Sequence, residues 1–112
     1  MEVENLLKLV VDACDDKHAY DIAAYDLTSA GLLYDYSVIC HAPTQRQVEA
    51  IANEVREKVL ENDLKIYSTE GLREARWVLM DLGDVVVNIL TRDDREYYEL
   101  DALFEKYPLK GV

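Results

Sequence analysis

The chain has little of what several protein classes require. It contains four glycines and two prolines among 112 residues, and half of its residues are apolar, which argues against disordered and low-complexity architectures. Its longest purely apolar runs, such as residues 77–80, are far shorter than the ~20 residues of a membrane span. The first residues are acidic, unlike a signal or transit peptide. We therefore expect one globular domain over residues 1–112 that does not insert into membranes.

Cysteine and histidine are scarce as well. Cys14 and Cys40 lie far apart and form no C-x-x-C motif, so they do not suggest a disulfide framework. Their apolar neighbours indicate core positions, and a reducing, cytoplasmic location is expected. His18 and His41 belong to no motif with metal-ligand spacing, so the sequence predicts no zinc site.

Basic residues are few relative to acidic ones. Twelve Lys and Arg against 23 Asp and Glu give a net charge of -11. Phosphate backbones repel such a chain, which disfavours direct DNA binding and leaves little direct RNA contact. A basic protein partner would be attracted at long range. On charge alone, the acidity of a soluble domain is the commoner explanation, and both interpretations stay open.

Hydrophobic periodicity predicts a mixed α/β fold. The expected elements are a helix over 3–14, strands over 22–28 and 36–42, a helix from the 44–47 capping box to 61, strands over 65–69, 76–82 and 85–90, and a C-terminal helix from about 91–94 to 107. Because helices and strands are intermixed, we expect a single mixed sheet of about five strands packed with helices.

Phosphate-binding and nucleophile motifs are missing. No glycine precedes Lys or Ser, which excludes a P-loop and the G-x-S-x-G elbow, and there is no G-x-G-x-x-G. No serine has a nearby His that the spacing would make its base, and a Ser or Cys nucleophile assisted by His41 stays open only if the fold brings them together. The sequence favours a binding module over an enzyme and predicts no cofactor.

Asp81 and Asp84 bracket a tight turn between two strong strands, and Gly83 within it favours a positive φ. Two carboxylates at a turn can hold a hard cation, and Asp26 is a candidate third ligand. The alternative is that both are turn residues that bind local backbone groups, which is the commoner arrangement.

Trp77 is the only tryptophan and begins one of these strands. A single Trp in a strand is typical of a core. However, Trp, Arg and Met are enriched at the centres of protein interfaces, and here Trp77 follows Arg76 and precedes Met80. Eight tyrosines add amphipathic surface that suits an interface.

At these residues the sequence resembles the ribosomal silencing factor family, also called Iojap-like proteins. The resemblance extends over about residues 6–104 and is carried by the segments 21–22 DI, 25–26 YD, 35–40 DYSVIC, 46–47 RQ, 50–52 AIA, 70–71 EG, 77–87 WVLMDLGDVVV and 95–100 REYYEL. The chain departs from the family at three places. Asn88 replaces the usual His, Phe104 replaces Trp, and His41-Ala42 replaces a Ser or Thr followed by Gly.

The resemblance implies a fold similar to nucleotidyltransferases without a known enzymatic activity. It also implies binding to protein number fourteen of the large ribosomal subunit, on the face that joins the small subunit. Such binding would sterically block subunit joining and repress translation when nutrients are short. Members of the family can form homodimers. The alternatives are a nucleotidyltransferase-like enzyme and a dimeric adaptor that does not bind ribosomes.

The residues and the resemblance together predict a partner-binding site on the hairpin. We expect Trp77 to be its anchor, with Met80 and Leu82 as the apolar surround. Asp81 and Asp84 are expected to accept hydrogen bonds from Lys or Arg of the partner.

Overall fold

The computed structural model describes residues 1–111. Its elements in chain order are α1 (Val3–Asp16), β1 (Tyr20–Asp26), β2 (Tyr36–Ala42), α2 (Gln45–Glu61), β3 (Ser68–Glu70), β4 (Trp77–Asp81), β5 (Val85–Thr91), α3 (Arg92–Tyr98) and the 3₁₀-helix η1 (Leu100–Phe104). The five strands form one sheet in the order β1-β2-β5-β4-β3. The pair β2 and β5 is parallel and the other pairs are antiparallel. The predicted mixed sheet of five strands packed with helices is therefore confirmed.

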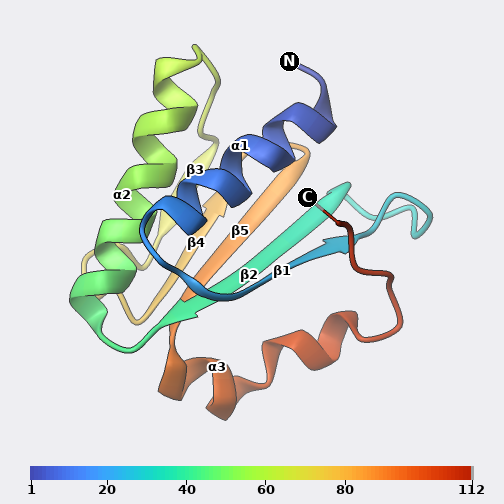
Figure 1. Ribbon diagram of the computed structural model, residues 1–112. Helices are drawn as coiled ribbons and strands as arrows, with labels where there is room; N and C mark the ends of the chain where they lie inside the picture. Colours follow the sequence, from blue (N-terminus) through green and yellow to red (C-terminus); the bar gives the residue numbers. More distant parts are fainter. Residues whose placement is uncertain (112) are drawn as a thin grey trace.

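Helices lie on both sides of the sheet (Figure 1). Helices α1 and α2 pack on one side, where their buried stripes join the inward-facing strand residues in the larger core cluster. The other side carries α3 and η1, above a smaller cluster of buried residues: Tyr25, Leu27, Ile39, Leu90 and Leu100. Both Cys14 and Cys40 are buried in the larger cluster, as expected.

The predicted cap of α2 is present in part. The Thr44 hydroxyl accepts a hydrogen bond from the Gln47 backbone N–H at 3.2 Å, which satisfies one of the free donors at the helix start. The Gln47 side-chain oxygen accepts from the Thr44 hydroxyl at 3.0 Å and not from the Thr44 backbone N–H. The second half of the expected capping box is therefore replaced by a side-chain pair.

The C-terminal region differs from the prediction of one continuous helix. Glu99 has a φ of 48°, in the left-handed region, and this residue separates α3 from η1. The break redirects the chain so that Leu100 is buried in the smaller cluster. Tyr97, which the periodicity placed on the apolar stripe, is instead 80% exposed.

Two strands also begin and end elsewhere than predicted. Strand β1 begins at Tyr20, and its pairing with β2 is irregular between Tyr20 and Ala23, with Asp21 at a φ of 47°. Strand β3 covers only Ser68–Glu70, opposite the end of β4.

None of the helices formed by residues 1–111 combines the length and apolar character needed to cross a membrane.

Candidate functional site

Strand β4 presents its side chains alternately to the two sides of the sheet. Val78 and Met80 are fully buried in the cluster beneath α1 and α2. Trp77, Leu79 and Asp81 have the opposite parity and are each partly exposed. Trp77 packs at the margin of the smaller cluster, on the side of the sheet that carries α3. The exposed part of β4 is therefore the side with Trp77.

This alternation corrects part of the predicted site. Met80 is 0% exposed and Leu82 is 5% exposed, and both belong to the larger core cluster. They therefore stabilise the fold and cannot form an exposed surround for Trp77. The prediction failed because both sides of β4 carry apolar residues, so the sequence does not show which side faces the solvent.

The residues that do surround Trp77 come from β5 and α3. The indole N–H donates to Oδ1 of Asn88 at 2.8 Å, and Asn88 is itself only 6% exposed. The Tyr98 ring lies 5.1 Å from the indole, centroid to centroid, and Tyr97 packs edge-on against Tyr98 at 5.0 Å. Since Tyr97 and Tyr98 are largely exposed, these rings form a surface patch, called here the aromatic cluster (Trp77, Tyr97 and Tyr98).

An ion pair fixes α3 beside the start of β4. The Arg76 guanidinium donates to both oxygens of Asp94, at 2.7 and 3.3 Å, and this carboxylate raises the pKa of Arg76. The Asp94 backbone N–H donates in turn to the Thr91 hydroxyl at 3.2 Å, which caps α3. These contacts hold α3, and with it Tyr98, beside Trp77.

A glycine allows the chain to pass closely over β4. Gly71 has a φ of 80°, and a Cβ at this position would lie 2.1 Å from the Trp77 carbonyl oxygen. Only glycine tolerates both the conformation and the approach. The Glu70-Gly71 pair thus serves to place the beginning of β4 and with it the indole.

A shallow pocket adjoins the aromatic cluster. Its volume is about 230 Å³, and it is lined by Gly71, Glu74, Arg76, Trp77, Asp94 and Tyr98. Its walls combine two aromatic rings with the Glu74 carboxylate and the Arg76–Asp94 ion pair. Such a pocket suits a side chain from a partner protein better than a free apolar ligand.

Asp81 and Asp84 have different surroundings. Asp81 accepts from the Gly83 backbone N–H at 2.9 Å and from the Tyr34 hydroxyl at 3.1 Å, so it acts as a turn residue. Burial, and secondly this bond to Asp81, raises the pKa of Tyr34. Asp84 is exposed, and its backbone oxygen accepts from the N–H groups of Asp35 and Tyr36.

The cation-binding alternative finds no support in these contacts. Asp26, the candidate third ligand, accepts from the backbone N–H and the hydroxyl of Thr28. Across residues 1–111 no three His, Cys, Asp or Glu side chains are placed to hold a metal ion.

Sequence reasoning missed Tyr98, Asn88 and the Arg76–Asp94 pair as parts of this surface. The segment 95–100 carries two adjacent tyrosines, whose amphipathic side chains suit an exposed surface. That signal was available. The Trp77–Asn88 bond depends on strand register, which pairs Leu79 with Asn88 and leaves Trp77 on the diagonal.

Comparison with known proteins places the whole described chain in one family. The family model described as "Ribosomal silencing factor during starvation" matches residues 1–111. The Ribosomal silencing factor RsfS of Bacillus subtilis is 46% identical over 112 residues, covering 100% of this chain and 95% of that protein. RsfS of Chromobacterium violaceum is 35% identical and covers 93% of this chain and 85% of its own length.

Solved structures agree with this match. A crystal structure from Bacillus halodurans superimposes with a TM-score of 0.87 at 40% identity, covering 97% of this chain and 99% of that chain. A crystal structure from Chromobacterium violaceum superimposes with a TM-score of 0.90 at 32% identity, covering 100% of this chain and 95% of that chain. The family match, the identities and the shared fold together show that this chain belongs to the ribosomal silencing factor family.

Proposed function

We propose that this protein represses translation by binding protein number fourteen of the large ribosomal subunit and sterically blocking the joining of the small subunit. The family match supports the ribosomal role. The observation that carries the mode of action is the aromatic cluster, an exposed patch of three aromatic rings in an otherwise acidic chain. Blocking requires affinity and bulk only, so it needs no catalytic group.

The chemistry of the aromatic cluster fits a protein partner. Trp and Tyr lead among residues that dominate binding energy, because they bury a large area at a low cost in side-chain entropy. Trp77 is anchored by Asn88, so its orientation is fixed before a partner arrives. Preorganisation of this kind reduces the entropy lost on binding.

The charge of the chain favours a basic partner. At a net charge of -11 the protein is repelled by ribosomal RNA but attracted by a basic ribosomal protein. Glu74 in the pocket and the exposed Asp84 on the hairpin are carboxylates that can accept hydrogen bonds from Lys or Arg, while Asp81 is already engaged within the chain.

Sedimentation with purified subunits tests the proposal. The protein should pellet with large subunits and not with small ones, and Tyr98→Ala should reduce the pelleted fraction. Leu60→Ala is the control, because Leu60 is 46% exposed against 54% for Tyr98 and lies on α2, on the side of the sheet opposite the aromatic cluster. Equal pelleting with both subunits, or equal effects of the two variants, would contradict it.

The family resemblance also leads us to propose a homodimer. Sedimentation velocity over a range of protein concentrations would show a rise toward twice the monomer mass. A constant monomer mass up to high concentration would contradict self-association. Such a result would leave ribosome binding untouched.

A further inference from the structure

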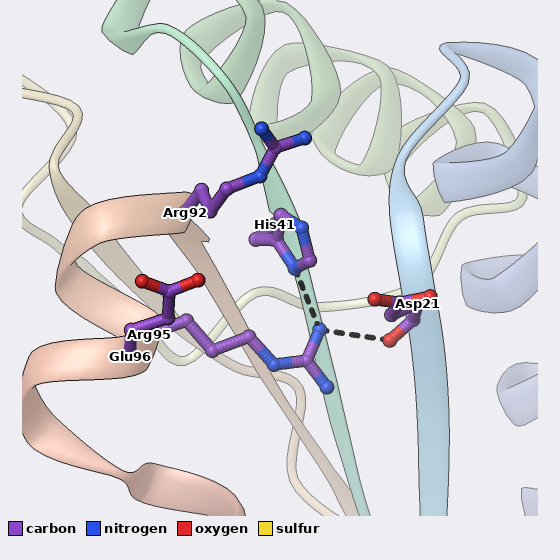
Figure 2. A pocket seen from close by; sticks show the side chains of 5 residues that line it. All are labelled: Asp21, His41, Arg92, Arg95 and Glu96. Atoms are coloured by element: carbon purple, nitrogen blue, oxygen red, sulfur yellow. Dashed lines mark hydrogen bonds between the residues drawn. The ribbon is translucent and has the colours of Figure 1, made fainter.

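A second pocket lies at the carboxyl ends of the two parallel strands. It has a volume of about 290 Å³ and is lined by Asp21, His41, Arg92, Arg95 and Glu96 (Figure 2). His41 is the penultimate residue of β2, and Arg92 begins α3 directly after β5. In open α/β sheets, ligands bind outside the carboxyl ends of parallel strands. The aromatic cluster contributes no residue to this pocket.

Arg95 is committed to holding the pocket together. Its guanidinium donates to both oxygens of Asp101 at 2.9 Å, and Nη1 donates to the Asp21 carbonyl oxygen at 2.8 Å. The same Nη1 lies 3.0 Å from Nδ1 of His41 (Figure 2). Asp101 neutralises the charge of Arg95, so Arg95 is a positioning residue.

The contact with Arg95 determines which nitrogen of His41 carries the hydrogen. A guanidinium can only donate, so Nδ1 is the acceptor and the ring hydrogen is on Nε2. Burial, and secondly the charge of Arg95, lowers the pKa of His41, which keeps the imidazole neutral at neutral pH. Figure 2 shows the second ring nitrogen on the side of Arg92. Within residues 1–111 no group accepts a hydrogen bond from it, although His41 is only 7% exposed.

Arg92 supplies the uncommitted charge of the pocket. Its side chain makes no hydrogen bond or ion pair with any other group in residues 1–111, and its guanidinium carbon lies 5.5 Å from the centre of the Tyr20 ring. The Tyr20 ring also stacks on His41 at 5.7 Å. Tyr20 thus contacts both Arg92 and His41.

We propose that Arg92 and His41 form a binding site for the phosphate group of a small phosphate monoester. A phosphate offers three acceptor oxygens in a tetrahedral arrangement and up to two negative charges, so it can meet a forked guanidinium and a separate imidazole N–H from different directions. The volume is at the lower end of the ~300–1,000 Å³ typical of ligand sites, which suits a small molecule.

Glu96 carries a negative charge in the same pocket, so replacing it tests whether charge in this pocket controls the binding of an anion. The carboxylates of Asp21 and Glu96 both belong to the lining of this pocket and both repel an anion; Glu96 is the residue whose charge the test removes. Removing that charge should strengthen phosphate binding, and removing the charge of Arg92 should weaken it. The proposal does not depend on ribosome binding, since its test uses the protein alone.

The experiment is an NMR titration of the whole chain at pH 7.5 and constant ionic strength. The probes are inorganic phosphate and ribose 5-phosphate, followed at the His41 ring and the backbone of 91–96. In the wild type, we expect the chemical shifts of these groups to change and then to saturate as the ligand concentration rises. Arg92→Gln should weaken binding about tenfold or more, as expected for the loss of a charge-assisted hydrogen bond. Glu96→Gln should tighten it. Arg56→Gln, on the exposed side of α2, is the matched control and should leave the affinity unchanged.

The outcomes separate the sources of the phosphate group. Tighter binding of ribose 5-phosphate identifies a monoester as the ligand, and equal affinities identify free phosphate in the same site. Shifts that do not saturate would overturn the proposal. So would equal losses in Arg92→Gln and Arg56→Gln, because they would show only a response to total charge. Unchanged wild-type-like spectra of the unliganded variants will show that each one is folded.

Discussion

Replacing Trp77 with alanine tests whether one residue serves both the fold and the proposed interface. The indole is partly buried, and its N–H satisfies the buried amide oxygen of Asn88. An unsatisfied buried acceptor costs about 1–3 kcal/mol. Lost packing adds to this, so we expect a loss of about 3 kcal/mol of folding stability. Truncation of Trp or Phe in a core costs about 3–5 kcal/mol. We expect the lower end of this range because part of the indole is exposed. The urea midpoint measures the loss.

Tyr98→Ala separates binding from folding. Tyr98 is 54% exposed, and its ring contact with Trp77 is worth about 0.5–1.5 kcal/mol. The variant should therefore stay folded. Its binding to large subunits should weaken by about 2 kcal/mol or more, roughly thirtyfold, if the ring belongs to the centre of the interface.

Both variants are measured by urea unfolding and by pelleting with large subunits, with Leu60→Ala as the control. The reasoning is refuted if Tyr98→Ala pellets as well as Leu60→Ala. It is also refuted if Trp77→Ala loses binding only in proportion to its unfolded fraction.

Three further perturbations follow from the structure. Gly71→Ala should cost at least about 2 kcal/mol in urea unfolding, since it adds a close contact with the Trp77 oxygen to the cost of a positive φ. Gly31 has a φ of 68° and no atom within 4 Å of an added Cβ, so Gly31→Ala should cost only about 1–2 kcal/mol. Equal losses in the two variants would contradict the role of the close approach at Gly71. Since the pKa of His41 is lowered in the folded state, its contribution to stability is complete above about pH 6.5. That contribution declines as the pH falls, because the unfolded chain takes up the proton first. The urea midpoint should therefore fall more between pH 7.5 and 5.5 in the wild type than in His41→Gln, and parallel profiles would contradict this. Finally, raising salt from about 50 to 500 mM should slow association with large subunits while changing dissociation less, and an association rate indifferent to salt would assign the acidity to solubility alone.

Local signals in the sequence determined much of the fold. The Thr44 cap, the helical spacing of α2 and the 81–84 turn each depend on neighbouring residues, and each is present in the structure. Cys14 and Cys40 are buried as their apolar neighbours indicated. Features set by a few adjacent residues could therefore be predicted.

Features set by tertiary contacts could not. Glu99 is a good helix former, yet it ends α3 in the left-handed conformation, after which Leu100 enters the smaller core cluster. The irregular start of β1 places Asp21 at a positive φ, from which its carbonyl oxygen accepts from Arg95. Neither residue carries a local signal for that conformation, because the partner that uses it is distant in the sequence.

The candidate site was predicted in part for the same reason. The sequence singled out Trp77, but the apolar residues on both sides of β4 concealed that Met80 and Leu82 are core residues. The neighbours that complete the surface, Tyr98 and Asn88, are brought to Trp77 by the packing of α3 and by the register of β5.

The central claim is that the protein prevents the ribosomal subunits from joining by occupying the large one. Light scattering of mixed subunits measures joining directly. Preincubating large subunits with the wild-type protein should lower the joined fraction, in proportion to the occupancy measured by pelleting, and Tyr98→Ala should require roughly thirtyfold more protein. Full joining on large subunits that are saturated with the wild-type protein would contradict the account.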